Sequence, residues 1–342
     1  MKKSILITGG AGFIGHQVIK EVLLSTDWNI FILDRLSYSG NLKRINDVIN
    51  ETDSQNSNRV EFVFHDLKAK IINENFATLK NVNYIIHIGA SSHVTNSIEN
   101  PETFLQDNIV GTFNLLEFSR KLEKLELFYY FSTDEVFGPS SGSQKFLEWD
   151  RYNSKNPYSA TKAAAEELVI AYQNTYNINS IISHCSNVYG IRQHKEKFIP
   201  NTIWKILNNK EVIVHTNNDG IPGSRYYIHN EDVAKSTIYL VKNFKKNYLK
   251  VQEIQKTLPN KFNISGNSLI SNFEIVEKIG TILSKEFSYT LISKDPQRPS
   301  HDFKYGLDTS LLESIGGRFD QNFNLGLESV VKWYMKNPFW LN

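Results

Sequence analysis

Residues 4–15 read Ser-Ile-Leu-Ile-Thr-Gly-Gly-Ala-Gly-Phe-Ile-Gly, and this order of residue types indicates how the fold begins. The apolar run at 4–7 predicts a short buried strand, and the glycines predict a tight turn into an amphipathic helix that ends near Leu24. A second apolar run at 29–33 predicts the next strand, which leads into Asp34. Strand, glycine turn, helix, strand and acid in this order are typical of a dinucleotide-binding unit.

The glycine turn and Asp34 together predict a cofactor. Glycines let backbone N–H groups approach a pyrophosphate at a helix N-terminus. The carboxylate of Asp34 would accept hydrogen bonds from ribose hydroxyls and repel a 2′-phosphate, which favours NAD over NADP. Arg35, the next residue, argues weakly in the other direction. The alternative interpretation is an ordinary strand-to-helix turn, and the flanking strands and the acid argue against it.

The same alternation of strand and helix continues along the chain. Further strands are expected at 60–65, 84–88, 127–131 and 178–184, and long helices at 101–122 and 158–176. We therefore predict an α/β fold, a Rossmann-type doubly wound parallel sheet with a smaller C-terminal substrate-binding α/β region. Residues 1–190 would form the NAD-binding domain, and residues 191–342 would mainly bind substrate, with some segments returning to the sheet. The Lys- and Gln-rich segment 243–259 is expected to be a solvated loop.

Composition narrows the class of protein. The 342 residues carry 38 Lys and Arg against 36 Asp and Glu, and a net charge of +2 gives no reason to expect nucleic acid or an anionic membrane as partner. Cys185 is the only cysteine, so no intrachain disulfide can form. No stretch approaches the roughly 20 apolar residues of a membrane helix, and glycines interrupt the N-terminal apolar run. The nine histidines lack metal-ligand spacing. We expect a cytoplasmic protein without a metal.

Two motifs carry groups that can transfer protons. Thr133, Asp134 and Glu135 directly follow the apolar run at 127–131. Tyr158 and Lys162 lie one helical turn apart, so both project from the same helix face. A neighbouring ammonium is expected to lower the pKa of a phenol and make it a usable base. The carboxylate pair could supply a second acid and base, which indicates a multi-step reaction rather than a binding module.

These motifs resemble those of a known family. The spacing of Gly9, Gly12 and Gly15 resembles that of the extended short-chain dehydrogenase/reductases, and the sequence Thr-Asp-Glu-Val at 133–136 resembles that of their nucleotide-sugar 4,6-dehydratases. Such enzymes act on dTDP-glucose or UDP-glucose and yield 4-keto-6-deoxy sugars, here expected to serve deoxysugar biosynthesis of the rhamnose type. The resemblance extends over nearly the whole chain and implies a homodimer formed through the two long helices.

The resemblance also implies roles for the catalytic groups. Tyr158 would remove a hydroxyl proton while a hydride leaves the same carbon for NAD, and Lys162 would hold the nicotinamide ribose. Ser132 or Thr133 would hydrogen-bond the same oxygen. Because C4 oxidation makes the C5 proton acidic, Glu135 could then take that proton while Asp134 protonates the departing C6 hydroxyl. The hydride would return at C6, which regenerates NAD.

Binding residues follow from the same resemblance. The expected cofactor contacts are Gly9, Gly12, Phe13, Ile14, Gly15, Asp34, Asp66, Leu67, Ala90, Asn108, Tyr158 and Lys162. The expected substrate contacts are Ser92, Thr133, Asn187, Glu196, Lys197, Arg225, Asn263, Arg298 and His301.

The chain departs from the family pattern at Phe137, where the family usually has Tyr, and at Thr95, Asn96 and Ser300. These departures concern which sugar and which nucleobase the substrate carries. Two other functions are possible. A nucleotide-sugar 4-epimerase or decarboxylase would have the same fold, but an epimerase needs no pair of carboxylates at 134 and 135. A non-catalytic dinucleotide-binding protein would not need Tyr158 and Lys162.

Overall fold

The computed structural model describes residues 2–72, 76–254, 258–293 and 304–341. Its centre is a parallel sheet of seven strands in the order β10-β6-β5-β4-β1-β2-β3. The strands are β1 (Ser4–Thr8), β2 (Asn29–Asp34), β3 (Val60–Phe64), β4 (Tyr84–His87), β5 (Leu127–Thr133), β6 (Ser180–Cys185) and β10 (Lys261–Ile264). The predicted doubly wound α/β fold is confirmed.

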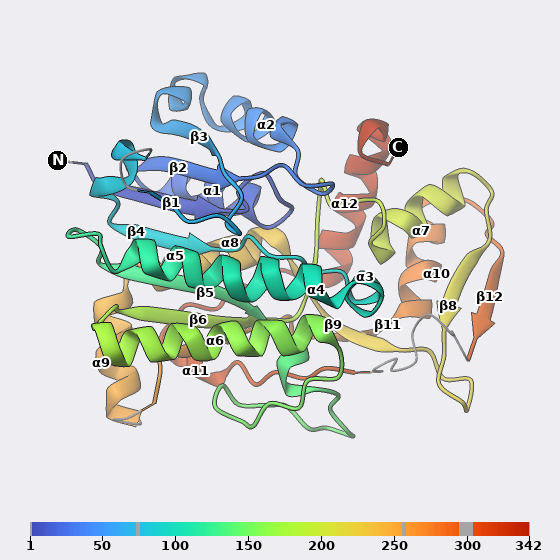
Figure 1. Cartoon of the computed structure of the whole chain (residues 1–342). Coiled ribbons are helices and arrows are strands. Elements are labelled where there is room, and N and C mark those ends of the chain that lie inside the picture. The colour runs from blue at the N-terminus through green and yellow to red at the C-terminus, as the bar shows by residue number, and fades with distance from the viewer. Residues whose placement is uncertain (1, 73–75, 255–257, 294–303, 342) are drawn as a thin grey trace.

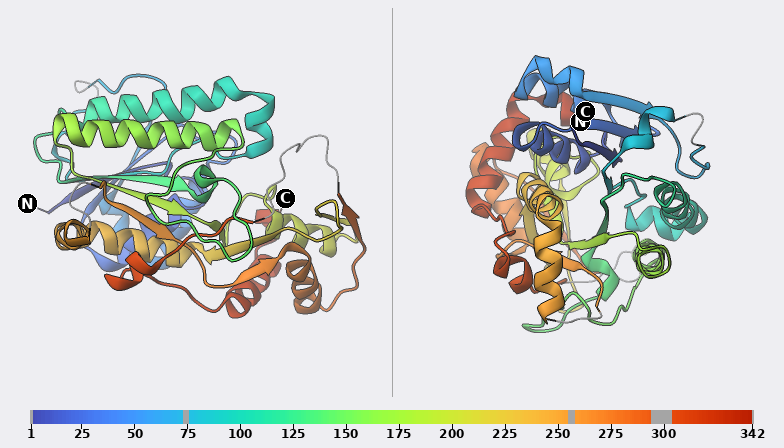
Figure 2. Two further views of the ribbon diagram at one scale, coloured as in Figure 1. Left: turned by 90° about the horizontal axis from the view of Figure 1, so that it is seen from below. Right: turned by 90° about the vertical axis from the view of Figure 1, so that its left-hand side faces the viewer.

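Helices cover both faces of this sheet (Figures 1 and 2). One face carries α4 (Pro101–Phe104), η3 (Leu105–Val110), α5 (Gly111–Ser119) and α6 (Pro157–Tyr176). The other carries α1 (Gly15–Ser25), α2 (Leu42–Thr52), α8 (Asn230–Lys242), α9 (Phe244–Ile254) and α11 (Ser310–Ser314). Each face has its own buried apolar cluster, as expected for a parallel sheet between two helix layers.

A smaller lobe with a separate apolar core lies at the carboxyl ends of the strands (Figure 1). It has the sheet β11-β9-β7 and the parallel pair β12-β8. Its elements are β7 (Asn187–Tyr189), α7 (Phe198–Leu207), β8 (Val212–His215), β9 (Ser224–His229), β11 (Leu269–Ser271), α10 (Asn272–Leu283), β12 (Tyr289–Ile292), α12 (Phe323–Lys336) and η5 (Pro338–Leu341). Short connecting helices are η1 (Ser54–Arg59), η2 (Ala77–Asn81), α3 (Val94–Glu99) and η4 (Asp134–Phe137).

The chain passes between the two parts more than once. After β7 and α7 in the smaller lobe, α8 packs on α1, and β10 then pairs with β6 and forms the edge of the sheet. The sheet therefore takes its last strand from the C-terminal half of the sequence. Across the described ranges, no helix is both long and apolar enough to span a membrane.

Two expected elements differ from the structure. Most of the segment 243–259 is helix where a loop was expected, because α9 occupies 244–254 and buries Phe244 and Val251 two turns apart. The expected helix at 101–122 contains a π-helical segment, η3, between α4 and α5. Such wider turns are rare and often lie at functional sites.

Candidate active site

A cavity of about 350 Å³ opens at the carboxyl ends of β1 and β4, where the strand order reverses. In doubly wound sheets this is where ligands bind. Many of the residues expected to bind cofactor or substrate, or to act in catalysis, line it. They are Gly9, Gly12, Phe13, Ile14, Asp34, Asp66, Leu67, Ala90, Ser92, Thr133, Asp134, Glu135, Tyr158, Lys162, Asn187, Glu196 and Lys197. We call the part around Asp34, Arg35 and Asp66 the adenosine end, and the part around Asp134, Glu135 and Tyr158 the reaction end.

The glycine turn has the shape that a dinucleotide requires. Gly9 has a φ of +70°, and a Cβ there would lie 2.7 Å from the Gly89 Cα atom. A Cβ at Gly15 would lie 2.2 Å from the Gly9 carbonyl oxygen, so this glycine lets the helix pack on the turn. Asp34 fixes the turn, because its carboxylate accepts hydrogen bonds from the backbone N–H groups of Ala11 (3.0 Å) and Leu36 (2.8 Å). The residues present therefore fit NAD.

The reaction end begins where β5 ends. Thr133 donates to Asp134 (3.2 Å) and its hydroxyl also accepts from the backbone N–H of Glu135 (3.3 Å). Asp134 is only 4% exposed, and its Oδ2 has no hydrogen-bond partner among the described residues. Burial, and then the negative charge of Glu135, raise the pKa of Asp134 to about 7. A carboxyl group with such a pKa can donate a proton near neutral pH.

Asn156 orients the second carboxylate, and the sequence reasoning missed it. Its Oδ1 caps α6 by accepting from the backbone N–H of Ser159 (2.8 Å), and its Nδ2 donates to Glu135 (3.1 Å). Asn before Pro157 at the start of the expected helix is an N-cap signal, which could have identified it. Glu135 is partly exposed and lines the cavity, so this bond aims an accepting carboxylate at the reaction end.

Tyr158 and Lys162 both line the cavity from α6, but their electrostatics differ from the expectation. The Lys162 ammonium donates to the Phe131 carbonyl (2.6 Å) and lies 4.2 Å from the centre of the Tyr130 ring. Burial lowers the pKa of Lys162 to about 7. The expected lowering of the Tyr158 pKa is wrong for the chain alone, because burial and the negative charge of Glu135 raise that pKa.

Behind the reaction end lies a buried polar cluster. The Ser132 hydroxyl donates to Glu166, which also contacts His184 (3.2 Å) and Lys261 (3.4 Å). Burial alone would raise the pKa of Glu166, but His184 and Lys261 hold it at about 2. Because the Ser132 hydroxyl is used in this cluster, Thr133 is the better candidate to bind a substrate oxygen.

Some expected contacts lie elsewhere. Asn263 is fully buried: its Nδ2 donates to the carbonyls of Phe146 and Asp308, both at 2.9 Å, and its Oδ1 faces His184. The expectation that it contacts the nucleotide is wrong, because the sheet core uses its amide. Asn108 is also buried and holds the cavity wall from behind, donating to Ser91 (3.1 Å) and Thr161 (3.0 Å).

Arg225 lies on β9, where its guanidinium donates to the Ser224 carbonyl (2.9 Å) and lies 5.2 Å from the centre of the Tyr305 ring. Its positive charge opposes the upward shift of the Asp134 pKa. Arg298, Ser300 and His301 lie outside the described residues.

Phe137, which differs from the family pattern, has a structural explanation. Its ring is 1% exposed and stacks on Phe146 with centroids 5.2 Å apart. It also meets the His184 ring edge-on at 4.7 Å. The Phe137 side chain is therefore packed in the interior and does not line the cavity.

Comparison with known proteins identifies the family. A model of the family described as GDP-mannose 4,6 dehydratase matches residues 6–317. The chain belongs to this family. The predicted nucleotide-sugar 4,6-dehydratase family, enzyme class and cofactor are thereby confirmed: the protein is a hydro-lyase that depends on NAD.

The curated relatives include dTDP-glucose 4,6-dehydratases. Those from Neisseria gonorrhoeae and Escherichia coli are 34% and 32% identical, and each alignment covers 98% of this chain. The alignments span 96% and 94% of the relatives' own lengths.

Two solved structures are similar to this chain, and one of them is a dehydratase. A dTDP-glucose 4,6-dehydratase from Streptomyces venezuelae, with NAD and TYD bound, has a TM-score of 0.84 and 27% identity, covering 99% of this chain and 100% of that one. A UDP-glucose 4-epimerase from Thermus thermophilus has a TM-score of 0.80 at 22% identity, covering 97% of this chain and 99% of that one. The second likeness is one of fold.

Proposed function

We propose that this dehydratase converts a nucleotide-diphosphoglucose to the 4-keto-6-deoxy sugar, with dTDP-glucose as the first candidate and UDP-glucose as the second. The observation that carries the proposal is the pair of unlike carboxyl groups at the reaction end. Asp134 is buried with a pKa of about 7, whereas Glu135 opens on the cavity and accepts a hydrogen bond from Asn156. Elimination of water needs one acid and one base side by side, whereas a 4-epimerase needs no such pair of carboxyl groups.

The first step removes the C4 hydroxyl proton. When bound, NAD supplies a nicotinamide ring that accepts the hydride from C4 and returns it at C6. Tyr158 takes the hydroxyl proton, and Thr133 hydrogen-bonds the same oxygen. Lys162 holds a positive charge beside the forming phenolate when it is protonated, which favours proton transfer to the oxygen of Tyr158.

The second step removes water. The C4 ketone makes the C5 proton acidic, and Glu135 takes it. Asp134 in its protonated form donates to the departing C6 hydroxyl, so the C6–O bond breaks and water leaves. Return of the hydride at C6 and of a proton from Glu135 at C5 completes the 4-keto-6-deoxy sugar, the kind of precursor that rhamnose-type deoxysugars require.

Other residues that line the cavity would bind the substrate. Ser92 lines it from the loop after β4, Asn187 from the start of β7, and Glu196 and Lys197 from the loop after β7. Lys197 can neutralise part of the diphosphate charge, and hydroxyl and amide groups can bind sugar hydroxyls. Arg225 and Arg298 remain candidates for the diphosphate on the grounds of family resemblance.

A homodimer through α5 and α6 forms part of the proposal. These helices run side by side on the outside of the molecule (Figure 2). Leu105 and Phe113 on the outer surface of η3 and α5 are 45% and 40% exposed. The exposed side of α6 carries the small residues Ala160, Ala164 and Ala171, which would let a helix of a second copy approach closely.

Mass spectrometry of the product tests the substrate assignment. The purified enzyme is incubated with dTDP-glucose and UDP-glucose separately, without added NAD. A product lighter by one water is expected, and the substrate that reacts faster identifies the preferred nucleobase, thymine or uracil. An unchanged mass with both substrates, even after NAD is added, would rule out the glucose assignment. Loss of carbon dioxide from the corresponding nucleotide-glucuronic acid would instead indicate a decarboxylase.

A further inference from the structure

Arg35 occupies a position where a positive charge would favour NADP over NAD. It follows Asp34 directly at the end of β2, and both line the cavity. In dinucleotide-binding folds, an arginine near this acid is what accommodates the 2′-phosphate of NADP. The structure therefore has to explain how a chain with Arg35 works with NAD.

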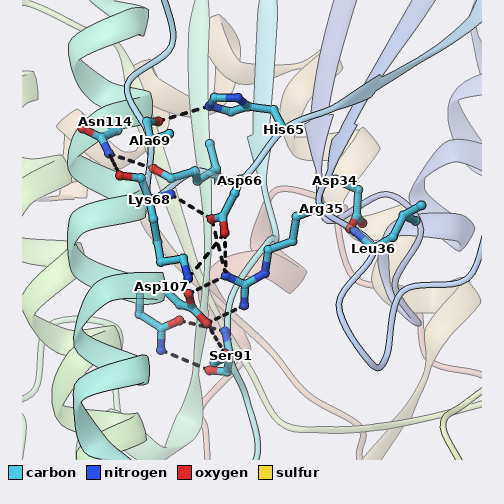
Figure 3. A network of polar contacts seen from close by, with 12 residues as sticks. Asp34, Arg35, Leu36, His65, Asp66, Lys68, Ala69, Ser91, Asp107 and Asn114 are labelled. Atoms are coloured by element: carbon cyan, nitrogen blue, oxygen red, sulfur yellow. Dashed lines mark hydrogen bonds and ion pairs between the residues drawn. The ribbon is translucent and has the colours of Figure 1, made fainter.

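Figure 3 shows that the Arg35 side chain points away from Asp34 and toward Asp107. The contact is bidentate: Nη1 donates to Oδ1 and Nη2 to Oδ2 of Asp107, each at 2.6 Å. Nη1 also lies 3.3 Å from a carboxylate oxygen of Asp66. Two parallel hydrogen bonds fix the orientation of the planar Arg35 guanidinium, and the Asp107 carboxylate compensates its charge.

Asp107 is itself held from behind. Its Oδ2 accepts from the Ser91 hydroxyl at 2.6 Å, and its side chain is only 4% exposed. It lies in η3, where the next residue, Asn108, bonds both backbone groups of Ser91. The π-helical turn thus aims two consecutive side chains at the same wall of the cavity. A buried carboxylate that is fixed this well holds Arg35 more firmly than a surface pair could.

We propose that Asp107 is a determinant of cofactor selectivity, because it holds the guanidinium of Arg35 away from Asp34 and so denies the 2′-phosphate of NADP its cation. The hydrogen bond with Asp107 is also the largest cause of a raised pKa at Arg35, so the guanidinium stays charged and paired. This role concerns the cofactor and does not depend on which sugar nucleotide is the substrate.

The other cations at the adenosine end are engaged as well. Lys68 pairs with Asp66 at 3.4 Å (Figure 3). Arg44 is 2% exposed and donates to the backbone carbonyls of Ala11 (3.0 Å) and Arg192 (3.0 Å). Of these three cations, Arg35 is the one that a carboxylate holds through two hydrogen bonds of 2.6 Å, and its contact with Asp66 is longer, so Asp107 is the residue to change.

The test is a cofactor-binding measurement. Dissociation constants for NAD and NADP are measured by isothermal titration calorimetry on enzyme freed of bound nucleotide, for the wild type and Asp107→Asn. The amide is isosteric but cannot hold the fork as an ion pair. The ratio Kd(NADP)/Kd(NAD) should fall by about tenfold or more, because a charge-assisted contact to the 2′-phosphate becomes available. The gain should shrink at higher salt.

Arg35→Gln provides the matched control. In the wild-type background it should change NADP affinity little, since the arginine is already engaged. In the Asp107→Asn background it should abolish the gain. A ratio within about twofold of wild type in folded Asp107→Asn would overturn the proposal. So would a gain that persists without Arg35.

If Asp107→Asn does not fold, Ser91→Ala replaces it, because this change removes only the hydroxyl that holds Asp107. It should lower the same ratio by about two- to threefold. An unchanged ratio in a folded Ser91→Ala variant would then count against the proposal. Equal weakening of NAD and NADP would show that Asp107 only shapes the cavity.

Discussion

The two ends of the cavity use charge in opposite ways. At the adenosine end, Arg35 and Asp107 form a bidentate ion pair, so both charges are compensated. At the reaction end, one carboxyl oxygen of Asp134 has no hydrogen-bond partner in the described part of the chain, and Lys162 donates to a backbone carbonyl. Burial therefore brings the pKa of each of these two groups to about 7. Paired charges keep their protonation and can select a ligand, whereas desolvated groups can exchange protons near neutral pH.

Glu135→Gln should disable the reaction end most completely. Without a base for the C5 proton, kcat for dehydration should fall by about 100- to 10,000-fold. Product formation is followed by mass spectrometry, and circular dichroism checks the fold. Glu328→Gln is the matched control, because it makes the same change on α12 at a side chain that pairs with Lys332. Activity within about threefold of wild type in Glu135→Gln would show that another group takes the proton.

Asp134→Asn tests the acid through its pH dependence. Wild-type kcat should decrease as pH rises through about 7, because only the protonated Asp134 can donate to the leaving hydroxyl. The variant should lose this alkaline limb and retain about one hundredth of the wild-type kcat. An unchanged limb would mean that a different group titrates, for which Lys162 is the first candidate.

At alkaline pH, Asp134→Asn should also be more stable than the wild type. Because the pKa of Asp134 is raised from 3.8 to about 7 by folding, the folded chain binds this proton more tightly than the unfolded chain. Stability from this group is full below about pH 4 and is lost as pH rises through about 7. The Tm of Asp134→Asn should exceed that of the wild type at about pH 8, and the two should converge at about pH 4. A lower Tm at about pH 8 would contradict this interpretation.

Asn156→Asp separates positioning from helix capping. Aspartate is also a good N-cap, so α6 should stay intact, but a carboxylate replaces the amide that donates to Glu135. We expect kcat to fall by about tenfold with little change in Tm. Asn156→Ser keeps a cap without adding charge and should have a smaller effect. Because both variants keep the cap, an unchanged kcat in both would show that Asn156 acts through the cap alone.

Phe137→Tyr should have the smallest effect. The ring packs on Phe146 below the reaction end, so kcat and the preference between dTDP-glucose and UDP-glucose should stay within about twofold. The added hydroxyl would be buried, so a modest decrease in Tm is expected. A changed preference would show that this departure from the family pattern reaches the substrate.

Much of this arrangement could be predicted from local sequence. The order of apolar strands and the glycine turn determined the sheet, because parallel strands between helix layers are short and apolar. Asp134, Glu135, Tyr158 and Lys162 could be predicted to share a site, since strand ends and the following helix meet at one edge of the sheet.

Other features depend on contacts between distant residues. The helix α9 was missed because its lysines hide the spacing of Phe244 and Val251. Asn263 lies at a position that matches the family motif, but its amide turns into the core to join His184. The raised pKa of Tyr158 follows from burial and from Glu135, which lies 23 positions earlier in the sequence. Sequence spacing alone could not reveal the Arg35–Asp107 pair, since 72 positions separate its members.

Turnover of dTDP-glucose in D₂O tests the central claim most directly. If the reaction end removes water through a C4 ketone, the product loses one water and gains one deuterium at C5. The deuterium comes from solvent, because Glu135 opens on the cavity and exchanges its proton. Mass spectrometry and NMR of the product should show both changes. An unchanged mass after incubation with added NAD, or water loss without deuterium at C5, would contradict the account.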